Sequence, residues 1–420
     1  MEERGRIFIF VLITASAATA VSSQEPPPSA APAASPAAEP PLTLDEAFAL
    51  AATNNRTITA ARLRRAIDQA GIDVAKERPN PDLRYEQAKE TPHQALTATQ
   101  PIELGGKRGR RIAVAEAVMR TGEAELALTQ ADVRAQVRRA YYGLAATQAR
   151  LAIALDLQGI ARRARDVASE RHEAGAVARL EVVQADLNLD QAENEATAVA
   201  GERDASRAEL NALIGRDTRA PTQVVEDLAD VTLPAAEAAA AAALAGNAEL
   251  AVLDRQMAEA VARAALARAQ RVPDPTLEGA VTHDSPGEFV WGWRYAVGVT
   301  VPLFTRHRAA VRVEEATIAQ LKAQREALVQ RLEGAVGAAL VRANTQRRQY
   351  LRYRDQILPR SREVEAMAEE SYRAGQTNLI ALLQALQAAR EARAKAVQAA
   401  YDYQVALAEL QRAAAVGPPP

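Results

Sequence analysis

Apolar positions along two long stretches of the chain follow the spacing of packed helices. Residues 107–174 contain no proline, and residues 303–417 contain Pro359 alone. In the first stretch, apolar and small side chains repeat in steps of four and three: Val133, Val137, Ala140, Leu144, Thr147, Leu151 and Ala154. This spacing is the seam of a coiled coil, and its small residues allow close approach. A continuous helix over residues 107–174 would be roughly 100 Å long.

Two other stretches alternate with a period of two, which is the spacing of β-strands. Residues 83–104 and 276–304 therefore each predict a β-hairpin, with loops at residues 89–94 and 285–294. The second hairpin gathers apolar side chains on one face: Tyr295, Val297, Val299 and Val301. Closely spaced prolines before each hairpin must end a helix there: Pro79, Pro81, Pro273 and Pro275.

The chain is a tandem duplication. Residues 171–185 return as residues 371–385, and the offset between their glycines is 375 − 175 = 200 residues. Gly175 and Gly375 each follow a helical pattern, where a left-handed backbone favours glycine, so each predicts the tip of a helical hairpin. Solenoid repeats are roughly 20 to 50 residues long, so this offset indicates two copies of a whole folding unit. Gly159 and Pro359 share the offset and predict a bend in each arm.

These patterns predict a first structural repeat over residues 42–215, a linker over residues 216–232 and a second repeat over residues 233–414. Thr43 and Glu46 have the spacing of a capping box at the start of the first opening helix, and Pro234 suits a first helical turn in the second. Each opening helix contains Asn, at Asn54-Asn55 and at Asn247. Residues 415–420 predict a disordered tail.

The amino terminus has the parts of a secretory signal peptide over residues 1–20. Arg4 and Arg6 precede an apolar run at residues 7–13, and small residues end at Ala20. The alternative is a membrane anchor, but a span needs about 20 predominantly apolar residues. Residues 21–41 are rich in Pro and Ala and predict a disordered spacer.

Composition narrows the function. Apolar residues make up 48% of the chain and aromatic residues 4%, which favours closely packed, Ala-rich helices. A net charge of −2 argues against nucleic-acid binding. The chain has no Cys, and its four His form no metal-ligand motif. No nucleophile with a base partner and no phosphate loop is recognisable, so the sequence predicts no enzyme, no cofactor and no metal site.

The two strand hairpins of one chain cannot by themselves form a closed β-barrel in a membrane. Trp291, Trp293 and Tyr295 suit the aromatic girdle of a membrane barrel, although they could instead cover a small soluble core. Four strands cannot close a barrel, because about eight is the lower limit. Open strand edges are not tolerated in lipid, so membrane-spanning hairpins would require several copies to share one barrel.

Taken in order, the duplication, the paired prolines, the hairpins, the Leu104-Gly105-Gly106-Lys107-Arg108 junction and the Ala-Gly tips resemble the outer membrane efflux protein family, the TolC-like exit ducts. The resemblance covers residues 42 to about 414, and residues 100–108 look most like the heavy-metal efflux branch, the CzcC and CusC type. It implies a mainly α fold with a small β part, in which a homotrimer forms a twelve-stranded outer-membrane β-barrel that continues into a periplasmic α-helical barrel.

The resemblance also implies partners and site residues. The duct would dock onto a periplasmic adaptor (membrane fusion) protein and an inner-membrane RND-type pump. Glu181 and Tyr372 match the family's gate at the periplasmic tip, with solvated and packed side chains as the alternatives. Ala381 and Gln384 replace the aspartates of the pore entrance, and Thr377 replaces the gate arginine. The adaptor-docking residues would be Gly175, Val177, Arg179, Leu180, Gly375, Leu379 and Ile380.

The sequence therefore predicts an outer-membrane exit duct with a large periplasmic portion, passive and opened at its tip, that exports heavy-metal cations. One alternative keeps the duct but makes its substrate a drug or a type I secreted polypeptide. Another is a soluble periplasmic coiled-coil scaffold or adaptor, which explains the helical seams but not the two-faced strands.

Overall fold

The computed structural model describes residues 41–90, 92–225, 233, 235–283, 291–301 and 303–414. The predicted signal peptide, most of the predicted spacer and the predicted tail lie outside these residues, as do Pro234 and residues 226–232 of the linker. The described part is mainly helical and carries one small antiparallel sheet, as the sequence predicts.

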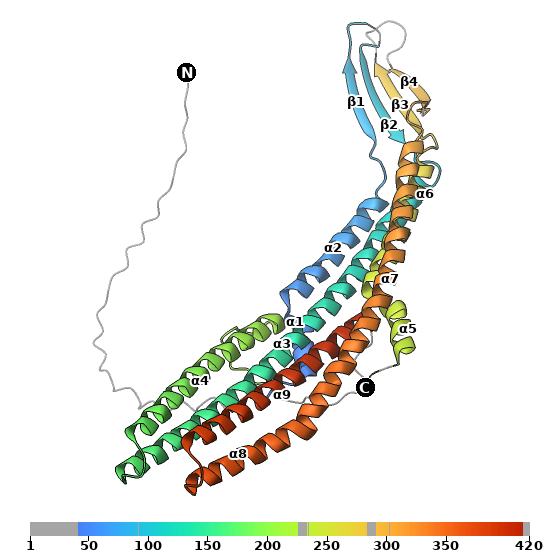
Figure 1. Cartoon of the computed structure of the whole chain (residues 1–420). Helices are drawn as coiled ribbons and strands as arrows, with labels where there is room; N and C mark the ends of the chain where they lie inside the picture. The colour runs from blue at the N-terminus through green and yellow to red at the C-terminus, as the bar shows by residue number, and fades with distance from the viewer. Residues whose placement is uncertain are drawn as a thin grey trace, which may run out of the picture. The chain divides into compact units, whose positions relative to one another are not determined.

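Each half of the chain contributes two short helices, a strand hairpin and a long helical hairpin (Figure 1). The first half comprises α1 Leu44–Asn54, α2 Arg56–Lys76, β1 Asp82–Gln87, β2 Gln94–Pro101, α3 Lys107–Glu173 and α4 Arg179–Ile214. The second comprises α5 Ala236–Gly246, α6 Ala248–Ala269, β3 Pro275–His283, β4 Trp291–Val299, α7 Arg308–Arg352, the π-helix η1 Tyr353–Ile357, α8 Leu358–Arg373 and α9 Leu379–Ala414.

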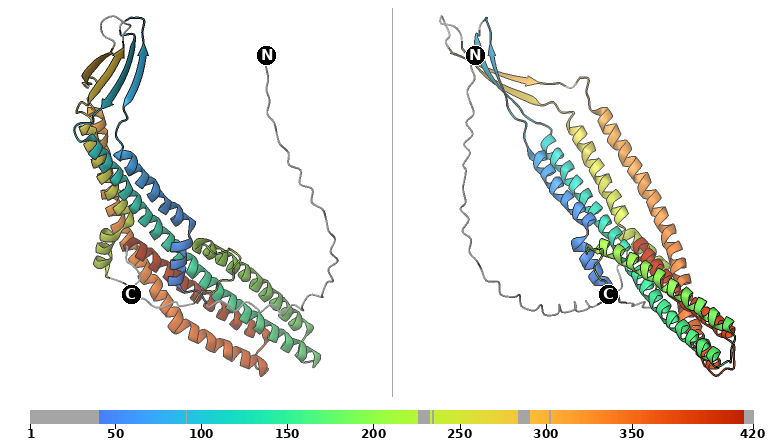
Figure 2. Two further views of the ribbon diagram at one scale, coloured as in Figure 1. Left: turned by 180° about the vertical axis from the view of Figure 1, so that it is seen from behind. Right: turned by 90° about the vertical axis from the view of Figure 1, so that its left-hand side faces the viewer.

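The sheet lies at one end of the helices, and the α3–α4 and α8–α9 turns lie at the other (Figure 1, Figure 2). Helix α3 is 67 residues long and reaches from the sheet to the tip. Its predicted seam is confirmed by burial, because most of the seam side chains are shielded from solvent: Val133, Val137, Leu144, Thr147 and Ala154.

At Gly159, where the sequence predicts a bend, α3 continues as an unbroken α-helix. The second arm is interrupted, because η1 separates α7 from α8 directly before Pro359. Glycine keeps its N–H and costs a helix only about 1 kcal/mol. Proline lacks the N–H and clashes with the preceding turn, so a wider π-turn is one way to accommodate it.

Each opening helix is two helices rather than the single one that the sequence predicts. Asn55 separates α1 from α2 with an extended backbone, and its side-chain oxygen accepts the N–H groups of Thr57 and Ile58 at 2.9 and 3.2 Å. Asn247 separates α5 from α6 in the same way and accepts the Leu250 N–H at 3.1 Å. Asn is a strong amino-terminal cap, so each asparagine ends one helix and starts the next.

The two strand hairpins join into one sheet in the order β1-β2-β3-β4, because β2 pairs with β3 across the duplication. Strand β4 begins at Trp291, so residues 291–294 are strand rather than the predicted loop. Strands β1 and β4 form the two edges of the sheet.

The junction between sheet and helices links the two halves. The Asp274 carboxylate accepts the Leu104 N–H at 2.9 Å and pairs with the Lys107 ammonium at 2.6 Å. Gly105 has a φ of 67°, and a Cβ there would lie 2.8 Å from Val272 atoms. Arg111 pairs with Glu103 and donates to the backbone carbonyl oxygens of α2 and its carboxyl end. The Leu-Gly-Gly-Lys-Arg run is therefore a packed connector between the halves.

Candidate functional site

The two tip turns have the same backbone geometry. Gly175 and Gly375 have φ angles of 75° and 70°. The Gly175 N–H donates to the His172 carbonyl at 2.9 Å, and the N–H of the next residue donates to Arg171 at 2.8 Å. The second turn repeats both bonds, at 3.0 and 2.9 Å. This is the Schellman motif, in which glycine takes the left-handed position after a helix. The sequence prediction of a left-handed glycine at each tip is confirmed.

Tyr372 and Glu181 meet just inside these turns. Tyr372 lies in the last turn of α8 with 2% of its surface exposed, and its hydroxyl donates to Oε1 of Glu181 at 3.1 Å. Glu181 lies in the first turn of α4, where a helix stabilises a carboxylate. Burial raises the pKa of the Tyr372 hydroxyl, and the bond to Glu181 raises it further. The hydroxyl therefore stays protonated and donates at neutral pH.

Arg171, at the end of α3, completes a three-residue cluster that the sequence analysis missed. Its Nη1 lies 3.6 Å from Oε1 of Glu181, and its guanidinium lies 5.3 Å from the centroid of the Tyr372 ring. The sequence feature that could have identified Arg171 is the duplication, because the two copies differ at this position. The 200-residue offset pairs Arg171 with Ser371 and Glu181 with Ala381, so both charges come from one copy. Three helices, α3, α4 and α8, converge on this cluster.

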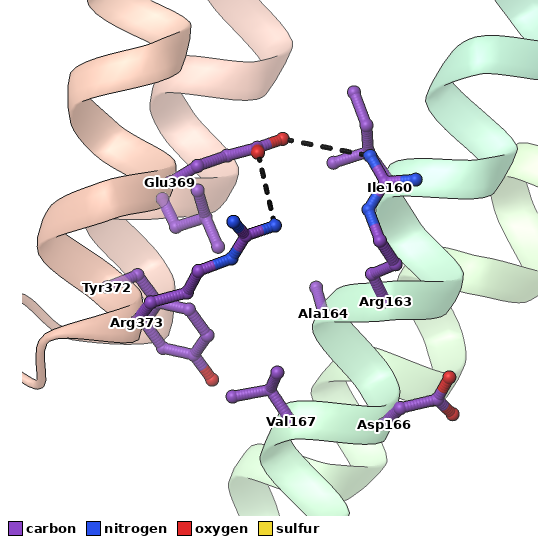
Figure 3. A pocket seen from close by; sticks show the side chains of 9 residues that line it. Ile160, Arg163, Ala164, Asp166, Val167, Glu369, Tyr372 and Arg373 are labelled. Atoms are coloured by element: carbon purple, nitrogen blue, oxygen red, sulfur yellow. Dashed lines mark ion pairs between the residues drawn. The ribbon is translucent and has the colours of Figure 1, made fainter.

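A shallow pocket of about 230 Å³ lies beside the cluster, between α3 and the α8–α9 hairpin (Figure 3). Its apolar part includes Ile160 and Leu382. At its rim Glu369 lies between Arg163 and Arg373, at 4.0 and 3.6 Å. The Arg163–Glu369 pair and the Tyr372–Glu181 bond both connect the end of α8 to the first hairpin, whereas the Arg373–Glu369 pair lies within α8.

The residues named for adaptor docking lie around the same turns. Leu180 is 65% exposed and Ile380 is 54% exposed, while Arg179 is exposed and Val177 is half-buried. A Cβ on either tip glycine would meet no atom within 4 Å. The Leu379 side chain is not among the side chains that the structure describes. Thr377 is half-buried and its hydroxyl has no hydrogen-bond partner in the described structure. Ala381 and Gln384 are exposed.

At the opposite end, the sheet has one apolar and one polar face. The strand register places Trp293 opposite Val281, Tyr295 opposite Gly279 and Val297 opposite Leu277. Most large apolar side chains of this face are exposed, and Val281 is half-buried. The exposed ones are Leu83, Tyr85, Leu96, Leu277, Trp291, Trp293, Tyr295, Val297 and Val299. The other face carries polar and small residues, including Arg84, Thr97, Glu278 and Arg294. An apolar face of this size without cover marks a site of membrane or protein contact.

Two other features of the described residues bear on function. No three His, Asp or Glu side chains in this part of the chain are grouped as metal ligands. Residues 236–269 are long and apolar enough to cross a membrane by composition, but Asn247 divides them into two helices. Ala239 and Ala243 of α5 pack in a cluster with Val336 of α7 and Leu410 of α9, so we attribute their apolar character to helix packing.

Comparisons with known proteins agree with this architecture. The sequence profile of the family described as outer membrane efflux protein matches residues 48–216 and 239–416. The chain is 29% identical over 378 residues to the cobalt-zinc-cadmium resistance protein CzcC of Cupriavidus metallidurans, covering 84% of this chain and 85% of that protein.

Solved structures show the same fold. The Campylobacter jejuni CmeC outer membrane channel superposes with a TM-score of 0.74 at 17% identity, covering 88% of this chain and 85% of that one. CusC superposes with a TM-score of 0.72 at 17% identity, covering 88% and 91%. Because the family profile matches most of the sequence in two blocks, one in each half of the chain, this protein belongs to the outer membrane efflux protein family.

Proposed function

We propose that this chain is the exit duct of a tripartite efflux system that exports divalent heavy-metal cations. Family membership puts the protein in the outer membrane with a periplasmic portion. The observation that carries the proposal is the four-stranded sheet, apolar on one face and open at both edges, joined to helix α3, which is about 100 Å long. A soluble periplasmic scaffold would not account for that exposed apolar face.

The duct is a homotrimer in this proposal. Unpaired N–H and C=O groups on β1 and β4 cannot remain open in lipid. Three copies supply 3 × 4 = 12 strands, which is within the range of outer-membrane barrels. In a barrel the apolar sheet face lies against lipid and the polar face lines the lumen, while Trp291, Trp293 and Tyr295 form the aromatic girdle at one boundary.

The tip cluster is the gate. The Tyr372–Glu181 hydrogen bond, with Arg171 beside it, holds the end of α8 to the start of α4. A hydrogen bond to a charged group contributes about 1.5–3 kcal/mol, so the contact holds the tip closed yet yields to a partner. The exposed tip residues, Leu180 and Ile380 among them, dock a periplasmic adaptor protein that connects the duct to an RND-type pump.

The cargo follows from the relative named for cobalt, zinc and cadmium resistance. Deleting the gene should sensitise cells to these metals, and wild-type protein should restore tolerance, while tolerance to hydrophobic antibiotics stays unchanged. Restored antibiotic tolerance without metal tolerance would assign the duct to drugs instead. The purified protein should also run as a trimer with sheet signal in circular dichroism. A water-soluble monomer would refute the duct.

A further inference from the structure

The apolar face of the sheet extends past the last residue of β4. Val301 and Leu303 continue its period-two spacing and are 59% and 62% exposed, and Phe304 beside them is 99% exposed. The first half does the same after β2, where Ile102 and Leu104 are 37% and 45% exposed. Both apolar runs end at the sheet–helix junction.

Arginines follow directly where the apolar runs end. Arg306, Arg308 and Arg312 follow Phe304, and Arg110 follows Leu104. All four side chains are exposed, and none forms an ion pair with a described residue. The Arg306 Nε donates only to the backbone carbonyl oxygen of Leu303, at 3.1 Å. Other basic side chains nearby are engaged within the chain: Lys107 with Asp274, Arg111 with Glu103, and Arg108 with the Lys76 carbonyl oxygen.

Helix electrostatics do not explain the three of these arginines that lie on helices. Arg110 lies in the first turn of α3, and Arg308 and Arg312 lie at the start of α7, where the positive end of the helix dipole disfavours a cation. Neither helix has an acidic residue in its first turn. Arg78 and Arg271, by contrast, follow the carboxyl ends of α2 and α6, where a helix favours a cation. Arg110 and Arg308 have no acidic residue within one helical turn, and Glu315, one turn after Arg312, is paired with Arg268.

The position of the sheet–helix junction relative to the membrane identifies which groups could neutralise the charges of these arginines. Strand β4 has nine residues, which span about 30 Å at roughly 3.4 Å per residue. A tilt of about 40° reduces this to the apolar band of about 25 Å that an outer-membrane barrel presents. With Trp291 at one boundary, residues 301–304 fall at the other, and the arginines fall just beyond it, at the level of the lipid headgroups.

We propose that Arg110, Arg306, Arg308 and Arg312 form an arginine belt that binds the phosphate groups of anionic phospholipids at the periplasmic surface of the outer membrane. Guanidinium and phosphate form paired, charge-assisted hydrogen bonds. Basic side chains beside exposed Leu and Phe are the pattern of a membrane-interface segment. The belt rests on the proposed function, since it requires the sheet to lie in the membrane.

Native mass spectrometry of the purified full chain tests the belt, because it reports oligomeric mass and bound lipid together. The test variant combines Arg306→Gln, Arg308→Gln and Arg312→Gln. The matched control combines Arg331→Gln, Arg348→Gln and Arg352→Gln, three exposed arginines further along α7 with no ion pair to a described residue. The control removes the same charge at a distance of about 35 Å or more from Arg308.

Added phosphatidylglycerol should bind the test trimer roughly a hundredfold more weakly than the wild-type trimer, because each of the three substituted arginines contributes roughly fivefold. The control should bind it like wild type, and phosphatidylcholine should not distinguish the three proteins. A triple Arg→Lys variant at the belt, which keeps the charge, should retain most of the binding. The advantage of phosphatidylglycerol should shrink as salt is raised.

A test trimer that keeps wild-type phosphatidylglycerol binding overturns the belt, and so does equal loss in the control. Displacement of the lipid by free glycerol phosphate would assign the arginines to a soluble phosphate and overturn the lipid proposal. These outcomes leave the duct standing, because the trimer mass is read in the same spectrum. A wild-type chain that forms no trimer in any lipid refutes the duct, and the belt with it.

Discussion

Tyr372 is almost wholly shielded from water, yet its hydroxyl reaches a carboxylate on another helix. Burying a hydroxyl without a partner costs about 1–3 kcal/mol, so Glu181 stabilises the packing of Tyr372 by accepting its hydrogen bond. Arg171 compensates the charge of Glu181 without a hydrogen bond to it. At the residue scale, the tip is a small cluster in which two groups act on one shared carboxylate.

Tyr372→Phe should raise the single-channel conductance or open probability in planar bilayers, because the ring keeps its packing while the bond to Glu181 is lost. The trimer should remain folded, with a loss of about 1.5–3 kcal/mol. Tyr401→Phe is the matched control, since it removes a hydroxyl from α9 outside the cluster. Unchanged conductance in Tyr372→Phe would contradict the gate.

A double-mutant cycle tests the shared carboxylate. Arg171→Gln and Tyr372→Phe should each favour the open state, and the double variant should gain less than the sum of the two, because both act through Glu181. The readout is the open probability in bilayers. Strict additivity would show that the two residues act independently.

At the element scale, the tip turns and the junction are short segments that set the direction of long helices. Each tip glycine has a positive φ, and the space that a Cβ would occupy there is open. A larger residue would carry backbone strain of about 1–2 kcal/mol and project outward. The junction instead depends on one carboxylate, Asp274, which ties together the two halves.

Gly375→Trp should abolish export in a metal-tolerance assay while leaving trimer and membrane insertion intact, because the indole would obstruct the adaptor at the tip. Gly375→Ala is the control, since it carries the same backbone strain without bulk and should keep export. Wild-type export by Gly375→Trp would refute the docking role.

Asp274→Asn should lower the thermal stability of the trimer at pH 7, and its deficit should shrink as the pH falls. Burial alone would raise the pKa of Asp274, but the bonds from Lys107 and the Leu104 N–H outweigh burial and hold the pKa below its usual value. The ionised carboxylate therefore stabilises the fold above its unfolded pKa of about 3.9, and this is lost as pH falls through the lower folded pKa. Calorimetry at pH 7 and pH 3 would measure both deficits, and equal deficits would argue against the ion pair.

At the scale of the whole molecule, the sheet is what a single copy leaves incomplete. Strands β1 and β4 have no outer neighbour among the described residues, and the apolar face between them has no cover. The helices bury their seams within one chain, whereas the strands do not. In the proposed trimer, assembly is therefore required chiefly by the sheet end.

Paired cysteines at the sheet edges should trap a covalent trimer. The chain has no native Cys, so Tyr85→Cys combined in turn with Cys at residues 295, 297 and 299 gives an unambiguous scan. Oxidised protein should form a trimer on a denaturing gel for at least one pair. Tyr85→Cys with Leu277→Cys is the control, because β3 is an interior strand and should not cross-link. Absence of trimer in every edge pair would contradict the barrel.

Patterns set within a few residues were readable from the sequence. The helical seam, the period-two strands and the left-handed tip glycines all follow from local backbone and side-chain spacing. The two asparagine caps are also local features. However, an Asn inside a stretch with the apolar periodicity of a helix does not by itself indicate that a helix ends there. At Gly159 the helix is not interrupted, because a helix tolerates glycine when its neighbours hold it in place.

Contacts between residues far apart in the chain were settled by tertiary packing. The pairing of β2 with β3, the meeting of Arg171 and Glu181 with Tyr372, and the bond from Leu104 to Asp274 each join segments from different halves. Nothing in either segment specifies such a partner, because register and side-chain proximity depend on how whole elements pack. Local sequence thus dictates which elements form and which of their faces are apolar, whereas the packed chain dictates which of those faces remain open.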